Sequence, residues 1–218
     1  MKKFLSLALS LVCLFCALPL AGCAKIDTTG LLDAAPALIE KSALVNEIFF
    51  GEGIPYDKNG EAQGYFYPAD AAWLAEHGIK TTADLATLTE SVFSQEYAAI
   101  ILGSGISGFP AGGGAYVYPR YASSQPENLR DEDETILVST NNEFLINPIG
   151  KSTYDYSTLT LIATARDYAV LALSVTTTTL LPEDERVEGE TNTTTTTVTM
   201  EIKFVFEGGA WRIDSPTY

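Results

Sequence analysis

Histidine, cysteine and basic residues are scarce in this sequence. Its 218 residues include one histidine and three cysteines, and 13 lysines and arginines stand against 28 aspartates and glutamates, for a formal charge of −15. Nucleic acids and anionic lipid headgroups bind clustered basic side chains, so a nucleic-acid partner and electrostatic docking on lipid are both excluded. The shortage of histidine and cysteine excludes most zinc sites and most histidine-dependent catalytic triads. We therefore expect neither a metal nor a cofactor.

The first 23 residues have the features of a bacterial export signal. Lys2 and Lys3 precede an apolar segment, residues 4–20, which is too short for a comfortable membrane-spanning helix. The segment ends in Leu20-Ala21-Gly22-Cys23, which resembles the lipobox of bacterial lipoproteins. The resemblance implies cleavage before Cys23, a lipid on its sulfur and acylation of its amine, so the mature chain would be anchored at the extracytoplasmic face of the cell membrane. The alternative is an ordinary secretory signal with an incidental cysteine.

The lipobox also accounts for the other cysteines. Cys13 and Cys16 have the C-x-x-C spacing of redox and metal motifs, but they lie in the segment that would be removed. The mature chain would then contain neither a free thiol nor a disulfide, and its fold would depend on packing alone. We expect a signal peptide at 1–22, a lipidated cysteine with a tether at 23–35, and a single α+β domain at 36–218.

Helical patterns dominate the first part of that domain. A helix is expected to begin near Pro36 and to end at Gly51 or Gly53. A short helix over 69–76 should end at Gly78, which places His77 at a helix C-terminus. There a positively polarised ring would interact favourably with the helix dipole, and this structural role is favoured over a catalytic one.

Two further helices have recognisable N-terminal caps. Thr81 and Asp84 have the spacing of a capping box, and Ser94 is the expected cap of a helix over 95–102. The glycine-rich segment that follows, residues 103–114, matches the glycine spacing of a dinucleotide-binding fingerprint. Proline and three further glycines come next, so no helix can begin there, and we interpret the segment as a flexible loop or lid.

From residue 116 onward the sequence favours strands. Strands are expected over 135–139, 154–164 and 168–179, and the last two are apolar on both faces in their middles, as in central strands covered on each side. Asn141-Asn142 is a hairpin turn signal, and the threonine run at 193–197 leads into alternating apolar and polar residues. Threonine favours strands, so we expect the run to belong to a strand.

The final hairpin can be set in register from its turn. Gly208-Gly209 is a two-residue turn signal, which pairs Phe206 with Trp211 and Phe204 with Ile213. The face of the hairpin that carries Phe204, Phe206 and Trp211 should pack on the core. Lys203 and Asp214 should then form an exposed pair across the two strands.

The order of elements, with Trp211-Arg212-Ile213-Asp214 after a glycine turn, resembles the NTF2-like (SnoaL-like) cone family. The resemblance implies N-terminal helices packed on a curled antiparallel sheet of about five to six strands, with room for a pocket between them. An unrelated helix-plus-antiparallel-sheet domain is the alternative.

Three functional hypotheses remain open. The first is a non-catalytic binding or interaction module of the cell envelope, whose ligand or partner, an envelope protein or glycan, is not indicated. The second is a binder of carbohydrate or wall fragments, and the third is a small-molecule enzyme with a carboxylate general base in the cone pocket. A homodimer through the outer face of the sheet is a further hypothesis, and the type of envelope stays open. The side chains that could stack on sugars are Tyr65, Tyr67, Trp73, Tyr116, Tyr118 and Tyr121.

Overall fold

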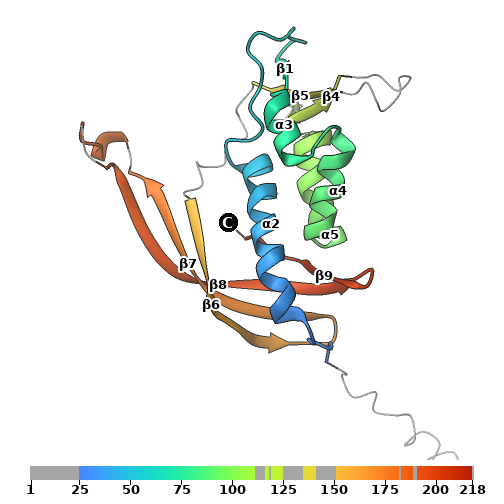
Figure 1. Cartoon of the computed structure of the whole chain (residues 1–218), viewed down its shortest axis with the longest axis vertical. Coiled ribbons are helices and arrows are strands. Elements are labelled where there is room, and N and C mark those ends of the chain that lie inside the picture. Colours follow the sequence, from blue (N-terminus) through green and yellow to red (C-terminus); the bar gives the residue numbers. More distant parts are fainter. Residues whose placement is uncertain are drawn as a thin grey trace, which may run out of the picture.

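The computed structural model describes residues 25–110, 116–117, 119–124, 135–140, 151–181, 183–188 and 191–217. The lipobox and the Asn141-Asn142 turn lie outside the described residues. The chain forms an α+β structure with antiparallel sheets (Figure 1). The elements, in chain order, are α2 (Leu31–Phe50), β1 (Phe66–Pro68), α3 (Ala71–His77), α4 (Thr82–Val92), α5 (Gln95–Leu102), η1 (Gly103–Ser107), β2 (Phe109–Pro110), β3 (Tyr116–Val117), β4 (Tyr121–Ser123), β5 (Ile136–Ser139), β6 (Lys151–Thr164), β7 (Tyr168–Leu180), η5 (Glu183–Glu185), β8 (Thr193–Glu207) and β9 (Ala210–Ile213).

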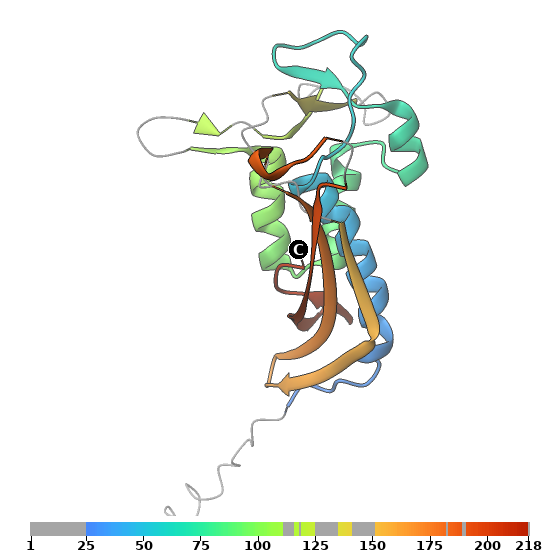
Figure 2. The ribbon, with the colours of Figure 1, turned by 90° about the vertical axis from the view of Figure 1, so that its left-hand side faces the viewer.

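The largest sheet has four antiparallel strands in the order β6-β7-β8-β9. It curves around the long helix α2, which lies against the concave face (Figures 1 and 2). The concave side chains of β7 explain this packing, because Ala169, Leu171, Leu173 and Val175 alternate along the strand and are all buried. Full burial of a large aliphatic side chain stabilises a fold by roughly 1.5–3 kcal/mol, so this stripe and its partners on α2 form the main core.

The position of β6 differs from our expectation of two central strands. β7 is central, but β6 lies at an edge of the sheet, and its Leu161 and Ile162 are 40% and 48% exposed. Periodicity alone cannot distinguish a covered strand from an edge strand, because apolar side chains occur in both. The two register shifts along β6, between Asp155 and Thr160 and again before Ala163, are irregularities typical of edge strands.

The final hairpin has the register that the sequence predicts. Phe206 pairs with Trp211 and Phe204 pairs with Ile213, around a turn in which both glycines have positive φ angles of 60° and 83°. Phe204 and Ile213 are fully buried, and Trp211 is nearly so. Phe206 is the exception on the aromatic side, because it lies next to the turn and half of it remains exposed.

Helix α2 begins five residues earlier than expected, at Leu31 rather than near Pro36. Its first turns include Leu31 and Ala35, which are fully buried, and this burial favours additional helical turns before the proline. Residues 31–35, which we had assigned to the tether, therefore belong to the helix. The segment before it is also held in place, since the Ile26 N–H donates to the Ala165 carbonyl at 2.8 Å.

The three shorter helices have the caps expected from the sequence. Thr81 and Asp84 form a complete capping box, and the Ser94 hydroxyl accepts from the Tyr97 N–H at 3.1 Å. Helix α3 ends at Gly78 in the left-handed conformation, one residue after His77. Within the described part of the chain, none of the helices combines the length and the apolar character that a membrane crossing requires.

Residues 103–110 of the glycine-rich segment do not form the flexible loop that the sequence predicts. Gly103–Ser107 continues α5 as a π-helical turn, and Phe109–Pro110 pairs with Tyr116–Val117 as a short hairpin. Residues 111–115 lie outside the described residues. Gly105 is buried against Phe49, and a Cβ at this position would lie 2.3 Å from the Phe49 Cδ1 atom. The glycine therefore permits a close helix–helix approach, which the sequence pattern does not reveal.

A second sheet contains three short strands in the order β1-β5-β4 and lies beyond one end of α2 (Figure 1). Its middle strand, β5, is buried along its whole length. The strand-like character of residues 65–67 and 135–139 was predicted, but their pairing in a separate sheet was not. In the described residues the strands are thus divided among separate sheets, and the four-stranded sheet is curved but not closed.

Candidate functional site

The space between α2 and the concave face of the four-stranded sheet is filled. Ile39 and Val45 from the helix meet Phe204, Leu171 and Ile213 from the sheet in one continuous apolar cluster. The C-terminal segment also enters this space, because Thr217 follows β9 and is completely buried. A pocket between the helices and the sheet, as the resemblance implied, is therefore occupied in this region by the chain itself.

Thr217 is held there by polar contacts from both sides. Its hydroxyl lies 2.8 Å from the Ser42 Oγ atom and accepts a hydrogen bond from the Asn46 Nδ2 atom at 2.7 Å, both on α2. Its carbonyl accepts from the Tyr154 hydroxyl of β6, also at 2.8 Å. These contacts join the helix to the edge of the sheet through the last described residue.

The polar groups of this interior are neutral. Burial raises the pKa of the Tyr154 hydroxyl, and burial, with contributions from Glu40 and Tyr154, raises the pKa of Tyr156 to about 12. Both tyrosines therefore stay protonated at physiological pH. The Asn46 Oδ1 atom and the Tyr156 hydroxyl are buried without a hydrogen-bond partner among the described residues. The general-base hypothesis stays a prediction, and this interior offers hydroxyls and an amide rather than a carboxylate for it.

An open cleft of about 280 Å³ lies between the junction of α4 with α5 and the β8–β9 turn. Two of its polar side chains already have structural partners. Arg212 donates through Nε to the Glu90 carbonyl at 2.9 Å, and Glu207 accepts from the Gln95 N–H at 3.0 Å. The cleft therefore joins the hairpin to the helices. The full set of lining residues is Glu90, Phe93, Gln95, Glu207, Gly208 and Arg212.

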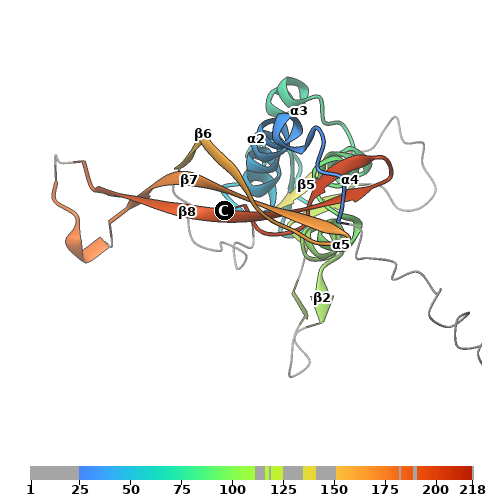
Figure 3. The ribbon, with the colours of Figure 1, turned by 90° about the horizontal axis from the view of Figure 1, so that it is seen from below.

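The most distinctive surface is the free end of the four-stranded sheet. Residues 176–180 of β7 and 193–197 of β8, which we call the threonine arm, extend beyond the helices (Figures 1 and 3). Residues 193–199 of β8 are all exposed. On one face the hydroxyls pair across the strands, Thr176 with Thr197 at 2.9 Å and Thr178 with Thr195 at 3.3 Å.

The described residues of the loop at the tip of the arm hydrogen-bond to one another. The Asn192 side chain accepts from the Val187 N–H at 2.7 Å and donates to the Val187 carbonyl at 2.8 Å. Arg186 donates from Nε to the Leu181 carbonyl at 2.7 Å. The two strands of the arm stay paired with each other as far as Leu180 and Thr193, the last pair before the loop.

One edge of β8 is open along the arm. Strand β9 pairs with β8 only over Phe204–Glu207, and no described strand pairs with this edge between Thr193 and Ile202. An open edge presents unpaired N–H and C=O groups, which is the surface that another strand recognises. This edge has neither a proline nor a lysine between Thr193 and Ile202, although those residues commonly protect exposed edges.

The aromatic residues proposed for sugar stacking do not form one platform. Tyr121 is fully buried, and its hydroxyl donates to the Ile48 carbonyl at 2.5 Å and accepts from the Ile54 N–H at 3.0 Å. Burial raises its pKa to about 12. Its assignment as an exposed stacking residue is wrong, because its ring is part of the core next to Phe49.

The other proposed stacking residues have mixed surroundings. Tyr65 is 69% exposed, whereas the Tyr67 ring lies 5.4 Å from that of Tyr56. Trp73 stacks on His77 with 3.9 Å between the ring centroids, and the His77 Nδ1 atom lies 2.8 Å from the Trp73 carbonyl. These contacts agree with a structural role for His77. The side chains of Tyr116 and Tyr118, like the lipidation site Cys23, lie outside the described residues.

Sequence reasoning missed the role of Arg120. Its buried guanidinium donates from one nitrogen to the carbonyls of Gly51 and Glu52, at 2.7 and 2.5 Å, and so caps the C-terminal end of α2. Gly53 passes close beside it with a φ of 83°, and a Cβ there would lie 2.2 Å from the guanidinium. The sequence signal was a glycine shortly after the end of a helix. Its contact with Arg120, far away along the chain, could not be inferred from that signal.

No protein-family model matches the chain, and no curated protein matches it either. Among the described residues, no three side chains of the histidine, cysteine, aspartate or glutamate type gather where they could hold one metal ion. The threonine arm with its open edge is thus the most distinctive candidate surface among the described residues.

Proposed function

We propose that this chain is a binding module of the bacterial cell envelope, held to the extracytoplasmic face of the membrane by a lipid on Cys23. Its binding surface is the threonine arm. The single observation that carries the proposal is the projection of two long paired strands beyond the helices, with the threonines of β8 exposed and one backbone edge open among the described residues.

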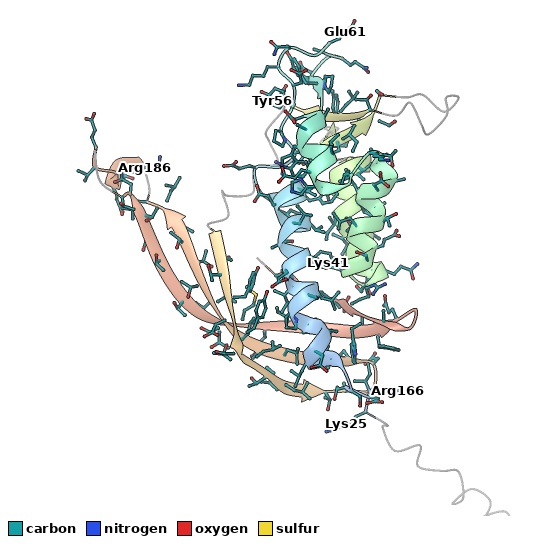
Figure 4. All side chains as sticks on the ribbon, in the orientation of Figure 1. Lys25, Lys41, Tyr56, Glu61, Arg166 and Arg186 are labelled. Carbon is teal, nitrogen blue, oxygen red and sulfur yellow. The ribbon has the colours of Figure 1, made fainter. Side chains whose placement is uncertain are left out.

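The position of the arm relative to the N-terminus supports this function. Lys25, two residues after the proposed lipidated cysteine, lies at one end of the sheet, and Arg186 in the tip loop lies at the other (Figure 4). A chain anchored near Lys25 would hold the arm away from the membrane surface. Residues 31–50 are helical and packed, and Ile26 is hydrogen-bonded to Ala165, so the tether is limited to the few residues before Ile26.

The anchor is tested by fractionation of cells that produce the full chain. Cys23→Ser removes the sulfur that would carry the lipid, and we expect the protein to move from the membrane fraction to the soluble fraction. Cys16→Ser is the matched control, because it lies in the segment that would be cleaved, and it should leave the protein in the membrane. Equal distribution of the two variants would overturn the anchor.

The binding surface is tested by photo-crosslinking in cells. A photoreactive residue at Thr195 on the arm should give discrete crosslinked species in the membrane fraction. The same residue at Arg166, which is exposed and lies near Lys25 at the opposite end of the sheet (Figure 4), should give none. Crosslinking at Arg166 but not at Thr195 would show that the arm is not the binding surface.

Carbohydrate binding is the second candidate, and the exposed ring of Tyr65 favours it, because a flat accessible ring can stack on a sugar. The two candidate functions predict that binding is weakened by substitutions at different places on the surface. Tyr65→Ala should weaken co-sedimentation with isolated cell-wall polymer if sugar binding is the function, whereas arm variants should not. The reverse pattern would favour the arm.

We further propose that the four-stranded sheet with α2 is a divergent NTF2-like cone. A long N-terminal helix against the concave face of a curved antiparallel sheet supports this, as does the final glycine-turn hairpin. The open sheet and the separate β1-β5-β4 sheet are departures from a single curled sheet. The buried segment around Thr217 occupies the region where a cone would have its pocket.

A further inference from the structure

We propose that the open edge of β8 pairs with the same edge of a second copy of this chain, so that two threonine arms form one continuous sheet. The inference rests on the proposed function, since it names the occupant of the binding surface. It differs from a dimer through the outer face of the sheet, because the contacts are backbone hydrogen bonds along one edge.

The direction of the free backbone groups follows from Lys203. Its carbonyl accepts from the Asp214 N–H at 2.8 Å and its N–H donates to the Ser215 Oγ atom at 3.1 Å, so both groups point away from β7. Backbone groups of alternate residues in a strand point to the same edge. The N–H and C=O groups of Thr195, Thr197, Thr199 and Glu201 therefore face the open edge.

The chemistry of the edge suits a copy of itself. The segment from Thr193 to Met200 has no charged residue in a chain with a formal charge of −15, so two copies can pair along it without opposing like charges. Threonine pairs across the β7–β8 strands already exist in the arm, at Thr176–Thr197 and Thr178–Thr195. An antiparallel β8–β8 contact would place threonines opposite one another in the same way.

The register follows from what already occupies the edge. Asp214 and Ser215 cover Lys203, so a second strand must pair nearer the arm tip. A two-fold axis at Thr197 pairs Thr197 with its own copy and Thr195 with Thr199 of the other chain. It also places Glu201 opposite Thr193 rather than opposite another glutamate. By symmetry the Thr195–Thr199 pair occurs twice, so there are three threonine pairs, and two bonds in each would give about six backbone hydrogen bonds.

This contact is small, and its size determines where to look for it. Stable complexes generally bury at least about 1,200 Å² of surface, and a single strand pair buries less. Confinement of both copies to one membrane by their lipid anchors would raise their effective concentration. We therefore expect the dimer in the membrane-anchored protein rather than in dilute solution.

Cysteine crosslinking in isolated membranes tests both the partner and the register. In the proposed pairing the two copies of residue 197 lie opposite each other, with about 5.5 Å between their Cα atoms. Thr197→Cys would therefore place two thiols within the range of a disulfide. Mild oxidation should convert this variant to a covalent dimer. Thr195→Cys and Thr199→Cys should not crosslink alone, but a mixture of the two should, and the chain without an added cysteine gives the background.

A matched pair of substitutions separates backbone pairing from random collision. Thr199→Pro, added to Thr197→Cys, removes one outward N–H and should abolish the crosslink, because proline cannot donate at a strand edge. Thr199→Val keeps the N–H and should preserve it. The Thr199 N–H does not face β7, so neither change breaks the pairing within the chain.

The outcomes distinguish this inference from the proposed function. Equal crosslinking of the three single-cysteine variants, or no crosslinking of Thr197→Cys, would overturn the β8–β8 contact. If Thr197→Cys fails while photo-crosslinking at Thr195 still gives a product that does not have the mass of a dimer, the occupant is not a second copy, but the arm remains the binding surface. If neither experiment gives a product, both proposals fail.

Discussion

Lys203 and Asp214 face each other across the final hairpin, with the Lys203 Nζ atom 2.6 Å from the Asp214 Oδ2 atom. The other carboxylate oxygen of Asp214 accepts from the Ser94 hydroxyl, which caps α5. Asp214 therefore joins the sheet to a helix N-terminus, whereas Lys203 contributes a partly exposed ion pair and lies over the Tyr168 ring, with Nζ 5.1 Å from its centroid. The two partners of one salt bridge thus have unequal structural roles.

This asymmetry predicts unequal effects of substitution. Asp214→Asn should lower the free energy of unfolding by about 1–3 kcal/mol, because it weakens a charged hydrogen bond to the Ser94 cap as well as the ion pair. Lys203→Met should cost at most about 1 kcal/mol, since the lysine side chain is 41% exposed and solvent screens the pair. Urea unfolding at pH 7 measures both values, and equal losses would contradict the role of Asp214 as the link to α5.

The capping box of α4 predicts a dependence on pH. Two backbone hydrogen bonds to the Asp84 carboxylate lower its pKa from the usual 3.8. The bond from the Lys80 N–H has the larger effect, and the bond from the Thr81 N–H adds to it. A carboxyl group whose folded pKa is lowered stabilises the fold above its unfolded pKa, and this contribution is lost as the pH falls through the folded value. Asp84→Ala should therefore cost about 0.5–1.5 kcal/mol at pH 7.

The same substitution should have less effect in acid. Below pH 3.8 the difference between Asp84→Ala and the unsubstituted protein should shrink, as thermal unfolding from pH 7 to pH 2 would record. A constant difference across that range would mean that the charge of Asp84 does not contribute to the cap.

The close contact of Gly105 with Phe49 predicts that a methyl group is not tolerated there. Gly105→Ala would place a Cβ 2.3 Å from the Phe49 ring and should destabilise the fold by about 1–3 kcal/mol through overpacking. Gly103→Ala is the control in the same segment, because no heavy atom lies within 4 Å of its Cβ position and its φ is helical. It should be neutral or slightly stabilising, and the reverse order in thermal unfolding would be inconsistent with the π-helical packing.

The buried hydroxyl of Tyr121 predicts a loss of stability without a change in binding. Tyr121→Phe leaves the Ile54 N–H without its acceptor and should cost about 1–3 kcal/mol. Tyr65→Phe, at a residue that is 69% exposed, should change stability by less than about 0.5 kcal/mol. If Tyr121→Phe instead weakened binding to wall polymer with its stability unchanged, Tyr121 would have to contact ligand.

Local features of the fold were predictable from the sequence, and features that depend on distant neighbours were not. The Thr81–Asp84 box and the Phe204–Ile213 register follow from residues only a few positions apart, so spacing alone identifies them. The edge position of β6, the burial of Tyr121 and the contact of Gly105 with Phe49 depend on partners more than 50 residues away or on strand order. Hydrophobic patterns do not contain that information.

The threonine arm shows the same division. The threonine run was correctly predicted as strand from its β propensity and from the alternation that follows it. Its exposure and open edge were not predictable, because they depend on the short length of β9, which pairs with only four residues of β8. The site proposed here is therefore a property of the sheet order rather than of any motif.

Amide hydrogen exchange along β8 in the membrane-anchored protein tests the central claim most directly. The amides of Thr194, Thr196 and Val198 face β7 and should be protected whether or not the arm has a partner. Those of Thr195, Thr197 and Thr199 face the open edge, and we predict that they become protected in the membrane and exchange freely in protein released from it. Free exchange of these three amides in the membrane as well would contradict an edge occupied by a partner strand.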